Sequence, residues 1–308
     1  MNSSRGGLPQ RVSIREVGPR DGFQNEPEVI STDDKVRLIE SLGATGLERI
    51  EVTSFVRSDV IPQLFDAEEV LSRARLPERA SVSVLIPNER GLERALTLRQ
   101  HFHEINGFLS ASESHNQRNV RRSISESLEG LRRVFGRARA EGLRCEGVIS
   151  VSFGDPYEGR VPAQRVLSIA RQLAEAGASE IAFGDTTGMA NPVQVGEFFA
   201  AALAELPDVE LTAHFHNTRG QGLANVLAAL EAGVASFESS FGELGGSPLT
   251  PGATGNLATE DLVSMLDEMG IETGVDLAKL LEASRGVQEV LGRPLGSHLL
   301  TAGPVEWS

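Results

Sequence analysis

The chain has 308 residues, 40% of them hydrophobic, which is enough apolar side chain for a sizeable buried core. Its formal net charge of −14 argues against nucleic acid or an anionic membrane surface as a partner. The single cysteine, Cys145, excludes an intrachain disulfide and suits a reducing compartment. No apolar run is long enough to span a membrane, and the polar N-terminal segment lacks a secretory signal, so we expect a cytoplasmic protein.

Short β-rich runs alternate with longer amphipathic stretches along the chain. The runs predict strands at 12–17, 47–54, 81–86, 104–110, 146–153, 180–184, 210–216 and 236–241. Apolar residues at helical spacing predict helices at 33–42, 123–141, 163–176, 191–206, 221–232 and 259–269. Residue types that favour helix ends stand at several expected boundaries: Ser31, Ser123 with Glu126, Thr259, Gly177 and Gly233.

About eight β-then-α units of this size predict an α/β fold, specifically a (β/α)8 TIM barrel. An open doubly wound sheet is the alternative, but no Gly-x-Gly-x-x-Gly loop follows the first expected strand. We expect residues 1–308 to form a single TIM-barrel domain. Within it, 1–10 would be a flexible N-terminal tail, and 276–308 an extra C-terminal helix at 277–291 with a short tail.

The strand at 210–216 ends in His214-Phe215-His216, the strongest single feature of the sequence. Alternate residues of a strand point to the same side, so both imidazoles should project together toward the barrel mouth. In such barrels, chemistry lies where strands end and the following loops begin. We therefore predict that His214 and His216 bind a divalent metal, against the alternative of two solvated loop histidines.

Asp21 ends the first expected strand and is the natural carboxylate partner for the two histidines. Once a barrel closes, the first strand neighbours the eighth, which is next to the seventh. The alternative for Asp21 is a turn residue, because Arg-Asp-Gly is a good turn sequence. Nitrogen and oxygen ligands without cysteine suit Mg²⁺ or Mn²⁺, with Zn²⁺ or Co²⁺ as further candidates.

A glycine-rich segment follows the eighth expected strand, with five glycines and two prolines in 241–256. This composition predicts a long, shaped loop at the catalytic face rather than a surface linker. Polar residues also end the second and sixth expected strands, at 51–54 and 184–186. These strand ends and the loop together mark one candidate active site.

These motifs resemble the 3-hydroxy-3-methylglutaryl-CoA lyase family. The matching segments, in the family's order and spacing, are 17–26 (VGPRDGFQNE), 50–56 (IEVTSFV), 156–159 (PYEG), 184–186 (GDT) and 252–261 (GATGNLATED). The resemblance implies a barrel that uses a divalent cation to cleave a 3-hydroxyacyl-CoA to acetyl-CoA and a keto acid. It also implies Arg20 as the electrophile, Glu51 as an active-site carboxylate, and four metal ligands: Asp21, His214, His216 and Asn256.

The chain departs from the family pattern at three positions. Ser247 stands where the family has a catalytic cysteine, Asn217 where it commonly has Asp, and Asp155 where it often has Cys. A serine hydroxyl does not ionise near neutral pH, whereas a thiol can exchange protons there. Cys145, expected just before the fifth strand, cannot replace the thiol. Three explanations stay open: another group, such as Ser247 or a water that it holds, transfers the final proton; the substrate is different; or the enzyme is weak.

From these residues we predict a metal-dependent carbon–carbon lyase for 3-hydroxy-3-methylglutaryl-CoA or a related 3-hydroxyacyl-CoA. The predicted catalytic residues are Arg20, Glu51 and Ser247. The residues predicted to bind substrate are Arg20, Gln24, Ser54 and Asp185. Two alternatives stay open: a condensing enzyme or aldolase of the same superfamily, and a catalytically silent binding barrel. We expect a homodimer or higher homo-oligomer that binds an acyl-CoA.

Overall fold

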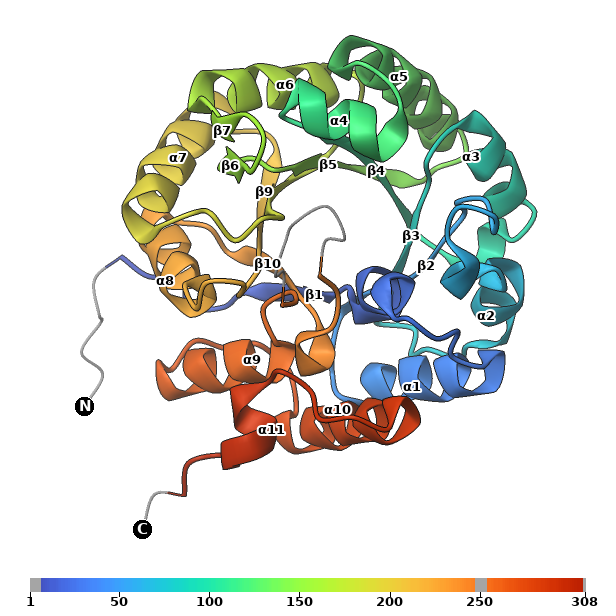
Figure 1. Cartoon of the computed structure of the whole chain (residues 1–308), viewed down its shortest axis with the longest axis vertical. Helices are drawn as coiled ribbons and strands as arrows, with labels where there is room; N and C mark the ends of the chain where they lie inside the picture. The colour runs from blue at the N-terminus through green and yellow to red at the C-terminus, as the bar shows by residue number, and fades with distance from the viewer. Residues whose placement is uncertain (1–6, 247–253, 307–308) are drawn as a thin grey trace.

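The computed structural model describes residues 7–246 and 254–306. Its parallel strands are β1 (Ser13–Glu16), β2 (Arg49–Ser54), β3 (Ser81–Leu85), β4 (Glu104–Ser110), β5 (Arg144–Ser150), β8 (Glu180–Asp185), β9 (Glu210–Phe215) and β10 (Ser236–Ser239). They close into a barrel in the order β1-β10-β9-β8-β5-β4-β3-β2, with helices around the outside (Figure 1). The predicted (β/α)8 barrel is confirmed, and each strand lies where the sequence predicted one.

The predicted helices are also present, with ends shifted by one or two residues: α1 (Thr32–Ala44), α5 (Ile124–Ala140), α6 (Ala163–Glu175), α7 (Pro192–Glu205), α8 (Gly222–Ala232), α9 (Thr259–Glu268) and α10 (Leu277–Leu291). The sequence did not predict α2 (Ala67–Arg73), α3 (Glu89–Leu96), α4 (Glu113–Val120), α11 (His298–Ala302), or the small hairpin β6 (Gly154–Asp155) and β7 (Gly159–Arg160). These elements are short, so each shows too few turns or residues for a periodic pattern.

Most of the expected helix ends are built as predicted. Ser31 caps α1, and Ser123 with Glu126 forms a complete capping box at the start of α5. Gly233 ends α8 in a left-handed conformation with φ 105°. Thr259 is the exception, because its hydroxyl donates to the buried Glu16 carboxylate at 2.6 Å instead of capping α9. A buried carboxylate is the stronger acceptor for this hydroxyl.

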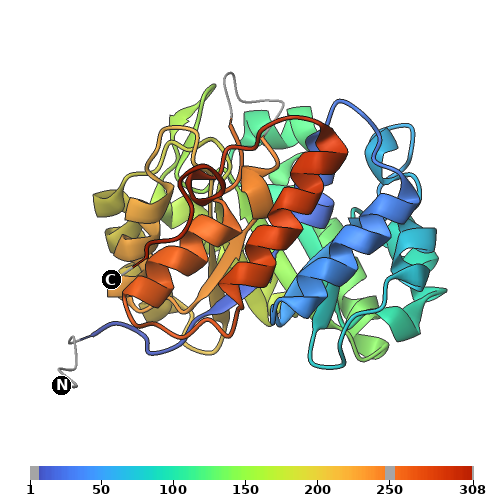
Figure 2. The same ribbon diagram turned by 90° about the horizontal axis from the view of Figure 1, so that it is seen from below.

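The outer ring of helices is completed by the C-terminal part of the chain. Helix α10 lies beside α1, the first helix of the barrel (Figure 2). The apolar faces of these helices pack on the strands and form one continuous core. Over residues 7–246 and 254–306, no helix is long and apolar enough to cross a membrane.

Candidate active site

A cavity of about 350 Å³ lies at the carboxyl ends of the barrel strands. One part of its wall is polar and includes Arg20, Asp21, Gln24, His214 and His216. Another part is apolar and is formed by Val56, Leu85, Phe108 and Val148. The cavity therefore offers a charged end and an apolar surface to one ligand.

A short π-helical turn, η1 (Gly18–Gly22), brings Arg20 and Asp21 to this cavity directly after β1. The amide of Phe23 donates to the carbonyl of Gly18, which gives the wider π spacing. Gly18 is required for packing, since a Cβ there would lie 2.4 Å from the Phe241 ring. An ordinary turn at Arg-Asp-Gly was the alternative interpretation of Asp21, and the π turn directs two consecutive charged side chains to one cavity.

The structure brings the four predicted metal ligands together. Asp21, His214 and His216 each offer a ligand atom, and these atoms lie within 4.8 Å of one another. The Nε2 atoms of the two histidines are 3.2 Å apart. Asn256 donates from Nδ2 to Asp21 at 2.7 Å, and its buried Oδ1 has no partner among the described residues. A carboxylate and two imidazoles thus converge on one point, and the amide of Asn256 contacts that carboxylate.

The protonation of His216 and Asp21 fits a divalent cation. Burial, together with His214, lowers the pKa of His216 to about 3, so its imidazole is neutral. Burial opposes ionisation of Asp21, but Arg20 and the two histidines outweigh it and lower the pKa of Asp21 to about 2. A neutral imidazole and an ionised carboxylate are the forms that bind metals. The unpartnered Asn256 oxygen is the ligand type that Mg²⁺, Mn²⁺ and Ca²⁺ accept.

His214 has a second partner that the sequence did not reveal. Its Nδ1 lies 2.8 Å from Oε2 of Glu238, a buried residue of β10. The carboxylate accepts a hydrogen bond from Nδ1–H, so Nε2 of His214 is the nitrogen left for a metal. A charged residue in the middle of the short strand SFES was the only signal for Glu238 in the sequence.

Arg20 is held between two carboxylates. Its Nε donates to Glu51 at 2.7 Å and its Nη1 to Asp21 at 2.5 Å. Glu51 also accepts a hydrogen bond from Asn106 at 2.9 Å and is fully buried. Gln24 lines the cavity and donates to Asp21 at 2.8 Å. Glu51 therefore lies behind Arg20, whereas Arg20 and Gln24 face the cavity.

Several predicted site residues are not among those that line the cavity. Ser247 lies outside the described residues. Ser54 and Asp185 are buried, each next to lining residues of the same strand end. The Ser54 hydroxyl accepts from the amide of Val56 at 3.2 Å, and Asp185 Oδ1 accepts from two amides of the following turn. Asp185 Oδ2 has no partner among the described residues, and the roles of Ser54 and Asp185 in binding substrate stay predictions.

His115 lines the cavity and was missed by the sequence reasoning. It lies in the first turn of α4, a polar helix that shows no periodic pattern. Its Nδ1 lies 2.6 Å from the Ser110 hydroxyl, and its buried Nε2 has no partner among the described residues.

Cys145 lies within β5, not before it, and its thiol is 3.9 Å from the carbonyl of Phe135 in α5. This thiol is directed to the helix layer, away from the cavity.

The fold and this site define a (β/α)8 barrel with a candidate divalent-metal site at the carboxyl ends of its strands. A family model described as HMGL-like matches residues 11–287. The chain therefore belongs to the HMGL-like family, whose members depend on a divalent metal.

Relatives in this family are similar to the chain over nearly its full length. A hydroxymethylglutaryl-CoA lyase of Bacillus subtilis is 46% identical over 95% of this chain and 97% of its own. A 3-hydroxy-3-isohexenylglutaryl-CoA/hydroxymethylglutaryl-CoA lyase of Pseudomonas aeruginosa is 41% identical over 96% of this chain and 98% of its own. The structure of an HMG-CoA lyase from Acinetobacter baumannii with coenzyme A and 3-methylmalate has a TM-score of 0.91 and 40% identity. The match covers 99% of this chain and 97% of that one. The predicted class of enzyme, a carbon–carbon lyase, is confirmed.

Proposed function

We propose that this chain cleaves 3-hydroxy-3-methylglutaryl-CoA between C2 and C3, giving acetyl-CoA and acetoacetate. The observation that carries the proposal is the meeting of Arg20 with Asp21, His214 and His216 in one cavity, with Asn256 bonded to Asp21. The similarity to hydroxymethylglutaryl-CoA lyases supports it. The complex of one relative with coenzyme A supports an acyl-CoA as the substrate.

The cleavage needs a proton to leave the C3 hydroxyl and negative charge to develop on the thioester. A bound divalent cation supplies a Lewis acid, which lowers the pKa of that hydroxyl and orients the substrate carboxylate. We assign the cation to Asp21, His214, His216 and Asn256, and favour Mg²⁺ or Mn²⁺ because the donors are oxygen and nitrogen. We assign the hydroxyl proton to Glu51 or to a water, because the histidines hold the cation and Nδ1 of His214 donates to Glu238.

Arg20 stabilises the electrons released from the C2–C3 bond. Glu51 and Asp21 fix its guanidinium, so its positive charge needs no reorganisation when the thioester enolate forms. C3 then becomes the ketone of acetoacetate, and C2 of the enolate takes a proton to give acetyl-CoA. We assign that last proton to Ser247 or a water that it holds.

The test is cleavage of 3-hydroxy-3-methylglutaryl-CoA by the purified chain with excess Mg²⁺ or Mn²⁺, measuring acetoacetate and acetyl-CoA. We expect His216→Ala to lose at least about 100-fold in kcat/KM, roughly 2.7 kcal/mol of transition-state stabilisation. His101→Ala is the matched control, because His101 lies in η4 (Arg99–His101), before β4 and outside the cavity. A parent enzyme that cleaves no substrate, but condenses acetyl-CoA with a 2-keto acid, would contradict the proposal.

Two finer expectations accompany this function and stay predictions. One is that the enzyme is a homodimer or a higher homo-oligomer, which sedimentation would test. The other is that it acts in the cytoplasm, which localisation of the tagged protein in its own cell would test.

A further inference from the structure

A row of paired residues crosses the barrel interior from one end toward the other. Arg49 of β2 pairs with Arg15 of β1, Arg15 pairs with Glu238 of β10, and Glu238 pairs with His214 of β9. Paired residues of neighbouring parallel strands point to the same face of the sheet. Because barrel strands are tilted and staggered, such a row climbs along the barrel axis. It therefore connects the end opposite the cavity with a predicted metal ligand.

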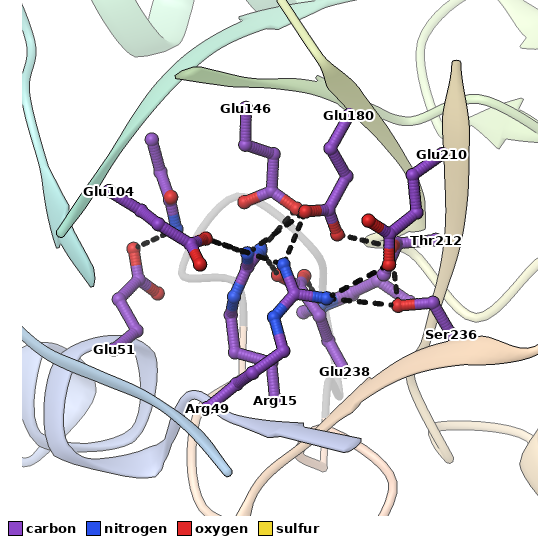
Figure 3. A network of polar contacts seen from close by, with 12 residues as sticks. Arg15, Arg49, Glu51, Glu104, Glu146, Glu180, Glu210, Thr212, Ser236 and Glu238 are labelled. Carbon is purple, nitrogen blue, oxygen red and sulfur yellow. Dashed lines mark hydrogen bonds and ion pairs between the residues drawn. The ribbon is translucent and has the colours of Figure 1, made fainter. Parts of the chain in front are cut away.

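Arg15 is the centre of a buried ion cluster in this row (Figure 3). Its guanidinium is fully buried and donates to Glu104 at 2.7 Å, Glu180 at 3.2 Å and Glu238 at 3.1 Å, with a further ion pair to Glu146. Barrel interiors are more often filled with branched apolar side chains. Arg15 is not among the residues of the cavity wall, so this charge is inaccessible to a ligand there.

Glu238 uses one oxygen for each neighbour. Oε1 accepts from Arg15, and Oε2 lies 2.8 Å from Nδ1 of His214. With Oε1 bonded to Arg15, the other oxygen of the carboxylate faces His214. The imidazole ring then holds its Nε2 toward His216, 3.2 Å away. Partners of this kind set the tautomer and orientation of metal-binding histidines.

The rest of the cluster provides an internal control. Glu146 also pairs with Arg15, and burial raises the pKa of Glu146 well above its ordinary value. Burial opposes ionisation of Glu180 as well, but Arg15 and Arg49 lower the pKa of Glu180 to about 2. A glutamine at position 146 would keep the size of the side chain and would remove no partner of His214 among the described residues. At position 238 the same substitution removes a carboxylate that Arg15 and His214 share.

We propose that Glu238, held in place by Arg15, is a positioning residue that orients His214 for metal binding. The inference rests on the metal site proposed above and adds two residues to it. It makes the ion cluster at the far end of the barrel part of the active-site framework.

The experiment compares Glu238→Gln with Glu146→Gln in the full chain. Binding of Mn²⁺ alone is measured from the electron paramagnetic resonance signal of the free ion. We expect Glu238→Gln to weaken Mn²⁺ binding by about 10- to 100-fold, and Glu146→Gln by less than about threefold. The Co²⁺ absorption bands should shift only in Glu238→Gln, which a general loss of stability would not produce. Near-ultraviolet circular dichroism confirms that both variants are folded.

Mn²⁺ binding by Glu238→Gln within about threefold of the parent would overturn the positioning role. A parent protein that binds no Mn²⁺ would instead contradict the metal site itself, and with it the proposed function.

The role of Arg15 is tested by Arg15→Lys, which keeps the charge but cannot reach several carboxylates at once. We expect it to weaken binding in the parent and to have no further effect in Glu238→Gln. If the two substitutions weakened Mn²⁺ binding by independent factors that multiply in the double variant, Arg15 would not act through Glu238. If Arg15→Lys does not fold, the Glu238→Gln comparison alone decides the proposal.

Discussion

At the scale of single residues, Arg20 has the most constrained position in the site. Burial alone would lower the pKa of Arg20, but Glu51 and Asp21 raise it above its ordinary value, so the charge is permanent. Both carboxylates bond to the guanidinium from the protein side, while Arg20 still lines the cavity. Such a fixed charge can stabilise an enolate without also being needed to hold the metal.

We therefore expect Arg20→Met to lower lyase turnover by at least about 100-fold while Mn²⁺ remains bound, in line with losses seen for preorganised electrostatic groups. Steady-state kinetics and Mn²⁺ titration measure the two effects separately. Arg57→Met, at an exposed arginine paired with Asp59, is the control. Turnover of Arg20→Met within about tenfold of the parent, roughly 1.4 kcal/mol, would show that Arg20 is not the electrophile.

Ser247 is the residue at which the chain departs most from its family pattern. If proton transfer is the only role of the family's thiol, Ser247→Cys should raise cleavage of 3-hydroxy-3-methylglutaryl-CoA, by up to about 10²–10⁴-fold. The two side chains differ by one atom, so packing should not mask the effect. Burial raises the pKa of Cys145 to about 12, so a thiol reagent at neutral pH should report the introduced cysteine. An unchanged or lower rate would point to another proton donor or another 3-hydroxyacyl-CoA.

At the scale of elements, one buried carboxylate ties β1 to the segment after β10. Glu16 accepts from the amides of Gly18 at 2.7 Å and Phe241 at 3.0 Å, and from the hydroxyl of Thr259. It thus joins the start of the π turn, the short 3-10 turn η5 (Phe241–Glu243) and the start of α9. Both segments that carry non-histidine ligands are anchored at this point.

This anchor predicts a pH dependence of stability. Burial raises the pKa of Glu16 from 4.5 to about 8. The folded state therefore holds this proton more tightly than the unfolded state. The stability that protonated Glu16 contributes is complete below about pH 4.5, falls as pH rises and is lost above about pH 8. Glu16→Gln resembles the protonated acid. The free energy of unfolding of this variant should therefore fall less between acid and alkaline pH than that of the parent, by on the order of a few kcal/mol.

Urea unfolding of both proteins at acid, neutral and mildly alkaline pH measures the difference. Glu48→Gln, at a half-exposed glutamate paired with Arg11, is the control and should leave the decline unchanged. If the free energy of unfolding fell equally with pH in Glu16→Gln and in the parent, the assignment of the proton to Glu16 would be contradicted.

At the scale of the whole molecule, the proposed ligands join parts of the chain that are distant in sequence. Asp21 follows β1, the two histidines end β9, and Asn256 precedes α9. A cation bound only by the folded state should stabilise it by about 2.7 kcal/mol at 100 times the Kd, which would raise the thermal midpoint by several degrees. Differential scanning calorimetry with Mn²⁺ should show this rise, and EDTA should reverse it. Asp21→Asn should show little rise, and an equal rise in that variant would contradict the ligand assignment.

Much of the architecture was predictable because it repeats. Eight runs of strand-forming residues between amphipathic stretches specify a barrel, and each run is a strand in the structure. The helices that were missed, such as α4, are short and polar, so tertiary contacts and capping define them more than apolar periodicity does. That 1–308 is a single domain with a flexible N-terminal tail stays a prediction.

The sequence by itself determined which residue types lie at the strand ends, and this was enough to place Asp21, His214 and His216 near one another. Asn256 was added by the resemblance to the family. Only the tertiary structure decided which side chains support these residues. Glu238 and Arg15 come from strands far apart in the chain, and they meet because barrel closure fixes the register of β1, β10 and β9. The same closure buries Ser54 and Asp185 and brings His115 to the cavity wall. Side-chain direction in a closed sheet depends on strand tilt and stagger, which no local segment encodes.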